Sequence, residues 1–376
     1  MSDVRRWGTW LPGIALAVAL AVAGKWLAGG LSSGVAAVLG LDPSAPDARN
    51  LVSGVAVAVV LGLVFRTAAG LPERCRPGVA FMARTGLRAG IVLLGFRLAL
   101  GTAGHVTAAA VPVAAACILA ALIIVTGLGR LVGVSARLAA LIAAGTSICG
   151  VTAIVALGPA IEAREDETSY AVACITIFGL LALFSYPWLA HALFGPSPLM
   201  AGIFLGTSIH DTSQVTGAGL IYQDAFGAPA ALHAATVTKL LRNISMAALI
   251  PFIAARFRTG GRTLTLREVK AAVPGFVLAF LAAIALRTAG DAAFAPDPAR
   301  AWGGPGAAEA WRWFLAVAAA GSTWALAAAL AGIGLTADLR KLRALGWRPL
   351  AVGFAAALSV GLVSAASLSA LAAWTR

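Results

Sequence analysis

Long, unbroken runs of apolar residues follow one another along almost the whole chain, and short polar stretches separate them. A membrane-spanning helix needs about 20 mostly apolar residues. Because the runs are continuous and do not alternate as strands of a β-barrel do, they favour helices. The pattern predicts an all-α polytopic membrane protein of about eleven transmembrane helices, near residues 10–28, 50–66, 87–103, 106–127, 138–160, 169–194, 198–222, 230–255, 272–288, 312–334 and 350–373.

Composition agrees with this pattern. Of the 376 residues 60% are hydrophobic and 11% are charged, whereas a soluble domain has about 25% charged residues. A soluble enzyme, a disordered chain and a small disulfide scaffold are therefore excluded. The net charge of +13 is spread over short loops, so it does not indicate nucleic-acid binding. The four cysteines have no metal-ligand spacing, and neither a disulfide framework, a metal nor a cofactor is expected.

Basic residues in the loops predict the orientation, because Lys and Arg are enriched on the cytoplasmic side. With the N-terminus inside, eighteen basic residues fall on the cytoplasmic side and seven outside. The seven are Lys25, Arg49, Arg164, Arg287, Arg300, Arg312 and Arg376. The expected location is a bacterial inner membrane with the C-terminus outside. The acidic run from Glu162 to Glu167 is then predicted to form an external loop.

Three predicted spans carry clusters of glycine, serine and threonine at mid-depth. They are 145–150 in the fifth span, 206–211 in the seventh and 321–323 in the tenth. Glycine loosens a helix, and short polar side chains cap freed backbone groups. Ser208 followed by Asp211 has the spacing of a capping box. Close packing of small residues is the alternative. We predict interrupted helices at Gly145, Gly150, Gly206 and Gly321.

The direction of these spans suggests an internal symmetry. The fifth and tenth spans are five helices apart and run in opposite directions, as expected for two inverted repeats. We expect an extra N-terminal helix at 1–48, a first five-helix repeat at 49–195 and a second at 196–376. The broken helices of the fifth and tenth spans are expected to cross.

Charged residues within spans are costly and mark candidate functional sites. Those predicted near mid-depth are Arg97, Asp211, Lys239 and Arg242, with Asn243 adjacent. Lys239 and Arg242 share one helix face. If Asp211 pairs with one of them, the surplus of positive charge suits a small anion. The alternative is a structural lock, in which Arg97 binds backbone carbonyls and Lys239 or Arg242 pairs with Asp211.

Several motifs are recognisable. They are GTSICG at 145–150, GTSIHDTSQVTGAG at 206–219, KLLRN at 239–243, GIVLLGFRL at 90–98 and GLTADLRKL at 334–342. The chain resembles the YeiH-like family of proteins named as sulfate exporters, along nearly its whole length. The resemblance implies a fold similar to that of bile-acid/sodium symporters and cation–proton antiporters, with inverted repeats and crossed broken helices.

Together these observations predict a secondary transporter of a small anion, sulfate or a related oxyanion or sulfonate. The expected anion pocket consists of Ser147, Cys149, Ser208, His210, Ser322, Lys239 and Arg242. Asp211, Arg97 and Asn243 are assigned to charge pairing or to coupling with a proton or sodium ion. A cation-coupled carrier of another organic substrate is the second hypothesis. An intramembrane enzyme using Cys149 and His210 is the third. A homodimer is left open.

Overall fold

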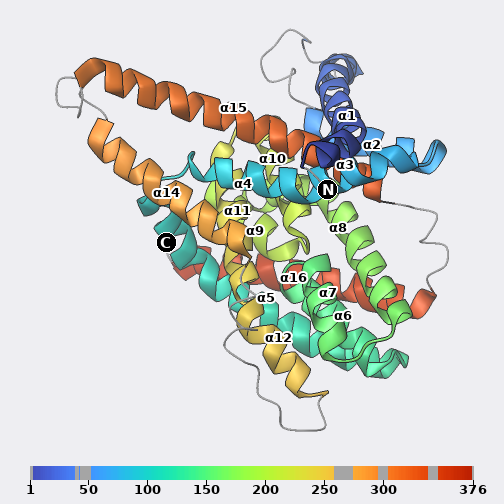
Figure 1. Ribbon diagram of the computed structural model, residues 1–376. Coiled ribbons are helices and arrows are strands. Elements are labelled where there is room, and N and C mark those ends of the chain that lie inside the picture. The colour runs from blue at the N-terminus through green and yellow to red at the C-terminus, as the bar shows by residue number, and fades with distance from the viewer. Residues whose placement is uncertain are drawn as a thin grey trace. The chain divides into compact units, whose positions relative to one another are not determined.

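The computed structural model describes residues 3–38, 42, 52–257, 274–294, 304–337 and 346–374, and these residues form helices without a strand (Figure 1). The helices are α1 (Asp3–Val38), α2 (Gly54–Ala68), η1 (Glu73–Cys75), α3 (Arg76–Phe81), η2 (Met82–Gly86), α4 (Leu87–Gly95), α5 (Leu100–Val132), α6 (Ala136–Ser147), α7 (Val151–Ala160), α8 (Glu165–Phe194), α9 (Pro198–Ser208), α10 (Thr212–Phe226), α11 (Pro229–Ile244), α12 (Met246–Ala255), α14 (Gly275–Phe294), α15 (Gly304–Thr336) and α16 (Trp347–Trp374).

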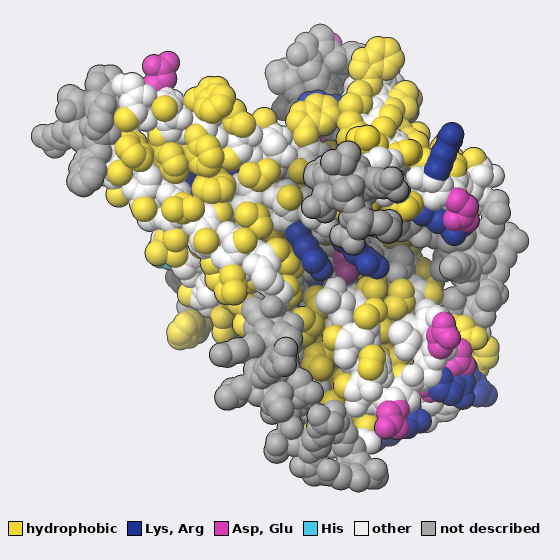
Figure 2. All heavy atoms as spheres, viewed as in Figure 1, with side chains coloured by type: hydrophobic (Ala, Val, Ile, Leu, Met, Phe, Trp, Pro, Cys, Tyr) yellow, Lys and Arg dark blue, Asp and Glu magenta, His cyan; other side chains and the backbone are white. Residues whose placement is uncertain are grey.

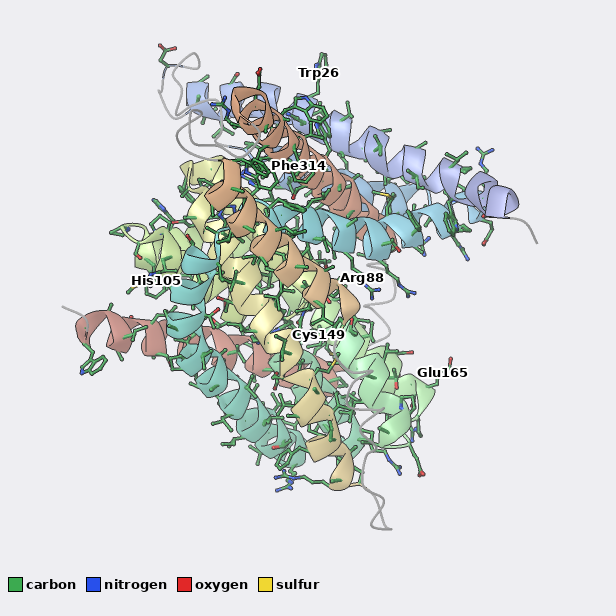
Figure 3. The ribbon with its side chains drawn as sticks, turned by 60° about the vertical axis from the view of Figure 1, so that its left-hand side comes forward. Trp26, Arg88, His105, Cys149, Glu165 and Phe314 are labelled. Carbon is green, nitrogen blue, oxygen red and sulfur yellow. The ribbon has the colours of Figure 1, made fainter. Side chains whose placement is uncertain are left out.

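The prediction of a polytopic, all-α membrane protein is confirmed. Eight helical segments in the described ranges are long and apolar enough to cross a bilayer. The shorter apolar helices are α2, α6, α7 and α9. Large apolar side chains remain on the surface, as lipid-facing residues do: Trp26 on α1 is 84% exposed and projects outward in Figure 3. Hydrophobic side chains cover most of the described surface in Figure 2.

The described chain divides into two compact units, each assembled from separated stretches of sequence. The first comprises residues 1–105, 224–226 and 275–338, and the second 106–223, 227–274 and 339–376. Neither unit coincides with a predicted five-helix repeat. The units are defined by compact packing, whereas the repeats are defined by internal symmetry, so the repeats stay a prediction. The boundary at residues 48 and 49 lies outside the described residues.

Small residues pack the first unit, which contains α1, α2, α3, α4, α14 and α15. A Cβ added to Gly62 on α2 would lie 2.5 Å from the Ala331 carbonyl oxygen on α15. A Cβ on Gly334 of α15 would lie 2.3 Å from the Val59 carbonyl oxygen on α2. Glycines on both sides of the crossing therefore let the two backbones touch, as in other closely packed membrane helices.

The predicted break in the tenth span is wrong. Helix α15 continues through Gly321, Ser322 and Thr323. The Ser322 hydroxyl donates to the Gly90 carbonyl of α4 at 2.9 Å, and the Thr323 hydroxyl donates to the Ala319 carbonyl one turn back at 3.0 Å. These small residues serve helix packing. The expected crossing of two broken helices is therefore wrong for the tenth span, because α15 has no break there.

In the second unit, α6 and α7 form a helical hairpin. Arg137 at the start of α6 donates from Nε to the carbonyl of Ile161, directly after α7, at 3.0 Å. A straight path over the 24 residues between them would separate the two by roughly 35 Å at 1.5 Å per residue. The chain must therefore fold back at 148–150, so the predicted span at 138–160 is interrupted and doubled back on itself.

Helices α9 and α10 form a second hairpin. Gly202 of α9 lies against Ala231 of α11, and Gly206 lies against Ala235 and Thr238, so α9 and α11 run parallel. Gly219 of α10 lies against Leu232 of α11, just across the Gly227 turn, as expected for antiparallel neighbours. Since α10 is antiparallel to α11, it must also be antiparallel to α9. The turn between α9 and α10 is at 209–211.

Both hairpin tips reach the middle of α8, from opposite ends. The base of the first lies at the start of α8, where the Ser135 hydroxyl donates to Glu167 Oε1 at 2.5 Å. The base of the second lies at the other end, where His191 is 3.4 Å from the Tyr222 hydroxyl. At the middle of α8, Ile175 contacts Gly145 and Gly179 contacts Gln214.

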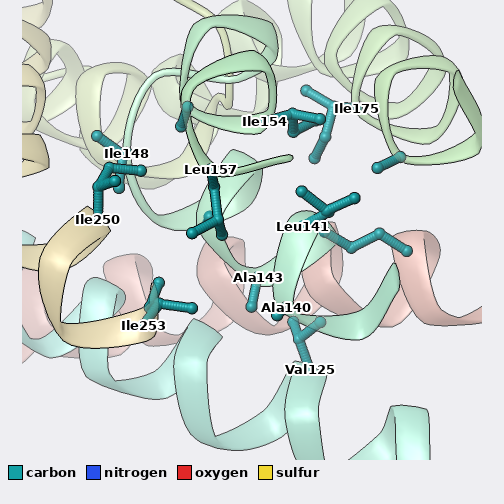
Figure 4. Close-up of a cluster of buried hydrophobic side chains, with 14 of the residues drawn as sticks. Val125, Ala140, Leu141, Ala143, Ile148, Ile154, Leu157, Ile175, Ile250 and Ile253 are labelled. Carbon is teal, nitrogen blue, oxygen red and sulfur yellow. The ribbon is translucent and has the colours of Figure 1, made fainter. Parts of the chain in front are cut away.

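Apolar packing holds the first hairpin against its neighbours. A cluster of buried side chains, shown in Figure 4, joins Leu141 of α6 and Ile154 and Leu157 of α7 to Ile175 of α8 and Ile250 of α12. Leu141, Ile154 and Leu157 are fully buried. Burying each such side chain contributes roughly 1.5–3 kcal/mol in water, and in lipid the close contacts themselves hold the helices.

Candidate functional site

The tip of the first hairpin is a three-residue break, Ile148, Cys149 and Gly150. Gly150 has a left-handed backbone with φ of 67°, which favours glycine. Its N–H donates to the Gly145 carbonyl at 2.9 Å. The predicted interruption is therefore confirmed, although Gly145 itself lies inside α6. A Cβ on Gly150 would lie 2.8 Å from Asp211 Oδ2, so the two tips touch.

The tip of the second hairpin is Ile209, His210 and Asp211, while Gly206 remains inside α9. Asp211 caps α10: its Oδ1 accepts from the Ser213 N–H at 2.9 Å, and the Gln214 Oε1 accepts from the Asp211 N–H at 3.3 Å. The capping box is thus Asp211 with Gln214. The predicted box from Ser208 to Asp211 is wrong, because the Ser208 hydroxyl donates to the Phe204 carbonyl at 2.5 Å.

Arg242 of α11 joins both tips with one guanidinium group. Nε donates to the Ser147 carbonyl at 3.1 Å, and Nη2 donates to the Thr146 carbonyl, both at the end of α6. Nη1 faces the end of α9, donating to the carbonyls of Gly206 at 3.3 Å, Thr207 and Ile209 at 3.4 Å. The cation therefore satisfies carbonyls that the breaks release and complements the negative ends of two helix dipoles.

Lys239 acts similarly on the second tip. Its Nζ donates to the Ile209 carbonyl at 3.0 Å and to the His210 carbonyl. In the described chain Asp211 makes no salt bridge with Lys239 or Arg242. The predicted pairing is therefore corrected: the two cations bind backbone carbonyls, the role that the sequence had suggested for Arg97, and Asp211 caps a helix.

Most of the predicted site residues gather at these tips. Ser147 is buried and its hydroxyl donates to the Ala143 carbonyl at 2.6 Å. The Cys149 thiol faces the Met246 sulfur at 3.7 Å, and Figure 3 shows Cys149 well inside the fold. Asn243 Nδ2 donates to the Thr212 hydroxyl at 3.2 Å. Ser322 and Arg97 belong instead to the first unit.

Five buried polar atoms around the tips have no hydrogen-bond partner among the described residues. They are Thr146 Oγ1, both ring nitrogens of His210, Thr238 Oγ1 and Asn243 Oδ1. Leaving a buried donor or acceptor unpaired costs about 1–3 kcal/mol. Their gathering beside two buried cations marks this region as a polar site inside an apolar unit.

Several residues of this region were not among the predicted site residues. Thr152, on the first turn of α7, is exposed, and Val151 beside it is half-buried. Gln214 connects the second tip to α8 by donating from Nε2 to the Thr176 carbonyl at 3.3 Å. The sequence signal was available for Gln214, since it follows Asp211 by the three residues of a capping box. Nothing in the local pattern singles out Thr176.

Comparison with known proteins identifies the family. The model of the family described as conserved hypothetical protein 698 matches residues 12–353. The chain belongs to this family. Similar proteins include a UPF0324 membrane protein of Nitratidesulfovibrio vulgaris, 30% identical over 330 residues, which cover 84% of this chain and 82% of that protein. The UPF0324 membrane protein TauZ of Paracoccus denitrificans is 32% identical over 301 residues, or 79% of this chain and 82% of TauZ.

The resemblance drawn from the motifs is confirmed, because the YeiH-like proteins and the UPF0324 membrane proteins form the same family. A further relative, from Bacillus cereus, is 30% identical over 308 residues, which cover 81% of this chain and 80% of the relative. The matched ranges include both hairpins of this UPF0324 protein. Its relatives are likewise named as membrane proteins.

Gly150→Ala tests the contact between the tips. The substitution places a side chain at φ 67° and ψ −127°, a backbone region found almost only in glycine, at a cost of about 1–3 kcal/mol, and pushes it into Asp211, which adds roughly 1–3 kcal/mol. We expect a clearly lower midpoint of thermal unfolding in detergent. Gly227→Ala is the control for positive φ alone, because Gly227 lies in the ordinary left-handed region with φ of 62° and ψ of 24°, and an added Cβ meets nothing within 4 Å. Equal shifts for the two variants would contradict the tip contact.

Proposed function

We propose that this UPF0324 protein is a secondary active transporter of a small anion, sulfate or a related oxyanion or sulfonate, working by alternating access. The observation that carries the proposal is the meeting of two helical hairpins midway along α8, with two buried cations at their tips. Secondary transporters place binding sites at mid-membrane, where discontinuous helices present their ends to the substrate. The proposal includes no enzyme activity and no cofactor.

The lengths of the hairpin limbs suit re-entrant segments. Helices α6, α7 and α9 have 12, 10 and 11 residues, which correspond to about 15–18 Å at 1.5 Å per residue. Half of a bilayer's hydrocarbon core is about 15 Å. These three limbs therefore have the length needed to reach the midplane from one surface. Helix α10, with 15 residues, is longer, at about 22 Å. The freed backbone groups at the midplane are tolerated because protein groups satisfy them.

The electrostatics of the tips favour an anion. Lys239 and Arg242 are fully buried, and Asp211 is the one acidic residue at the tips, so a formal surplus of one positive charge remains. The carbonyls orient these cations without cancelling their charge. The N-terminal end of α7 faces the same tip, and Gly150 gives it no side-chain cap. Its free N–H groups and the Thr152 hydroxyl are donors that an oxyanion requires.

In this proposal the predicted residues act in two ways. Lys239 and Arg242 supply positive potential from behind the tips, while Cys149 and His210 line the region in which the anion binds. Ser147 and Ser208, whose hydroxyls donate to carbonyls of their own helices, shape the tips. Asp211, partly exposed beside Gly150, is the group that we assign to a coupling proton or sodium ion.

A cation-coupled carrier of another small organic substrate remains the second candidate, and Asp211 favours it. One carboxylate oxygen, Oδ1, accepts from the Ser213 N–H and hydroxyl, which leaves Oδ2 to bind a cation. By contrast, the Cys149 thiol faces Met246, and the His210 ring nitrogens have no hydrogen-bond partner among the described residues. The geometry therefore gives no support to a Cys–His nucleophile.

Flux measurements with the purified protein in liposomes test the proposal. We expect saturable movement of one or more of sulfate, sulfite and small sulfonates, which responds to a proton or sodium gradient. Thr152→Val should raise KM for the anion at least about tenfold, since a hydrogen bond to a charged group contributes about 1.5–3 kcal/mol. Thr168→Val is the control, because the Thr168 hydroxyl donates to the Arg164 carbonyl at the hairpin base.

A variant without cysteine separates transport from thiol chemistry. Replacing Cys75, Cys117, Cys149 and Cys174, all buried free thiols, should leave flux in place, because the proposed mechanism uses no thiol chemistry; since Cys149 lines the anion-binding region, KM for the anion is the constant that the replacement can change. Gradient-dependent flux of neutral or cationic solutes, with none for any of the anions, would overturn the anion proposal in favour of the second candidate.

A further inference from the structure

A groove of about 630 Å³ is lined by residues of α5, α6 and α12 and does not include the hairpin tips; Figure 1 labels these three helices. Its walls are mostly apolar and include Leu119 and Ile123 of α5, Ala136 of α6 and Phe252 of α12. The charged residues that line it are Arg130 and Arg256, both at one end. The groove thus combines a long apolar surface with a basic entrance.

The two arginines are available to a ligand. Both are exposed, and in the described ranges neither guanidinium makes a hydrogen bond or an ion pair, while no acidic residue lines the groove. The Arg256 guanidinium stacks over the Phe252 ring, 4.7 Å from its centroid. This contact holds one cation directly above the apolar wall.

The length of the groove matches one leaflet of a bilayer. Arg130 lies two residues before the end of α5, and Leu119 lies eleven residues earlier on the same helix. That separation corresponds to about 16 Å at 1.5 Å per residue, close to half the thickness of the hydrocarbon core. A ligand with its charge at the arginines would extend an apolar tail to about the depth of the hairpin tips.

We propose that this groove binds a phospholipid with an anionic headgroup, whose phosphate lies between Arg130 and Arg256 and whose acyl chain follows Leu119, Ile123 and Phe252. Charge complementarity selects the occupant, because two unneutralised guanidinium groups bind a phosphate through charge-assisted hydrogen bonds. Positive residues are predicted at this end of α5 and α12, on the cytoplasmic side, where basic residues meet anionic lipid. The lipid also contacts α6 through Ala136 and so lies against the first hairpin.

Native mass spectrometry of the purified protein with phosphatidylglycerol or phosphatidylcholine of identical acyl chains tests the proposal. A basic residue near a membrane surface contributes about a fivefold preference for an anionic lipid, so two arginines predict about a 30-fold tighter phosphatidylglycerol complex. The double variant Arg130→Gln, Arg256→Gln should lose this preference. Arg88→Gln is the matched control, since Arg88 is an exposed arginine stacked over Phe276, 5.7 Å from its ring centroid, outside the groove.

Two further measurements keep the result unambiguous. Ala136→Trp narrows the groove and leaves both arginines in the sequence. It should weaken binding of both lipids. Soluble glycerol phosphate and sulfate should fail to displace phosphatidylglycerol, because they lack the tail. An unchanged preference in the double arginine variant, or equal displacement by a soluble anion, would overturn the lipid assignment. Neither result depends on the anion flux proposed above.

Discussion

A cysteine placed at Arg164 should react with a membrane-impermeant thiol reagent from the same side as a cysteine placed at Arg130. Both positions flank the first hairpin, whose two ends meet where Arg137 binds the Ile161 carbonyl. If α6 and α7 crossed the membrane as one span, the two positions would react from opposite sides. The measurement uses vesicles of both orientations and a background lacking the four buried native cysteines.

The second hairpin gives the complementary result. Cysteines at Pro196 and Pro229 should react together, from the side opposite to Arg164, because α8 lies between the two hairpin bases. Both positions are exposed. Reaction of Arg164→Cys and Arg130→Cys from opposite sides would show that the chain passes straight through and would remove the re-entrant hairpins from the mechanism.

This topology changes the predicted distribution of charge only slightly. Moving Arg164 to the cytoplasmic side raises the inside count of basic residues from eighteen to nineteen and lowers the outside count from seven to six. The orientation of the termini is unaffected, because two spans become hairpins and the parity of crossings is kept. The acidic run from Glu162 to Glu167, however, moves from the outside to the cytoplasmic side.

The second large effect is expected for Arg242→Gln. The sequence analysis assigned Arg242 to the expected anion pocket, and on that assignment alone the variant would fold and lose anion binding. In the structure, the guanidinium donates to five carbonyls at the ends of α6 and α9, and glutamine cannot replace it. The variant leaves several buried carbonyls without a donor, and each unpaired acceptor costs about 1–3 kcal/mol. We therefore expect a strong fall in the midpoint of thermal unfolding, together with loss of flux.

Two comparisons separate the geometry of Arg242 from its charge. Arg242→Lys keeps the charge but presents three donors on one atom, which cannot reach both helix ends, so an intermediate stability is expected. Arg137→Gln is the control, because Arg137 binds a single carbonyl at the partly exposed hairpin base, where about 1 kcal/mol is expected. An Arg242→Gln protein that unfolds at the wild-type temperature would show that Arg242 does not hold the tips together.

The breaks in the helices could be predicted from sequence, whereas the fold-back could not. Gly150 and Asp211 indicate the interruptions through their local chemistry, because a glycine can adopt a positive φ and a carboxylate can cap a helix. Hydropathy, however, depends on the number of apolar residues, which is the same for one straight span and for two half-length limbs. The deciding contact, from Arg137 to Ile161, joins residues 24 positions apart and has no local signature.

The same reasoning explains the wrong prediction at 321–323. Ser322 and Thr323 resemble the other clusters in composition, but no carboxylate follows them to cap a new helix start, and their hydroxyls donate to backbone carbonyls without interrupting α15. Likewise, the sequence offered Asp211 as the obvious partner for Lys239 and Arg242. The carbonyls released at both breaks are equally good acceptors, and they become visible only when the hairpins are assembled.

Because one guanidinium serves both hairpins, their movements are linked. In the proposed carrier, withdrawal of α6 and α7 breaks the bonds to Thr146 and Ser147, and withdrawal of α9 and α10 breaks those to Gly206, Thr207 and Ile209. Withdrawal of both at once leaves a buried cation with none of these acceptors, so that conformation is the least populated. In that conformation, ions would also cross the membrane down their gradient without carrying substrate. In the proposed carrier, Arg242 therefore limits the uncoupled leak of ions.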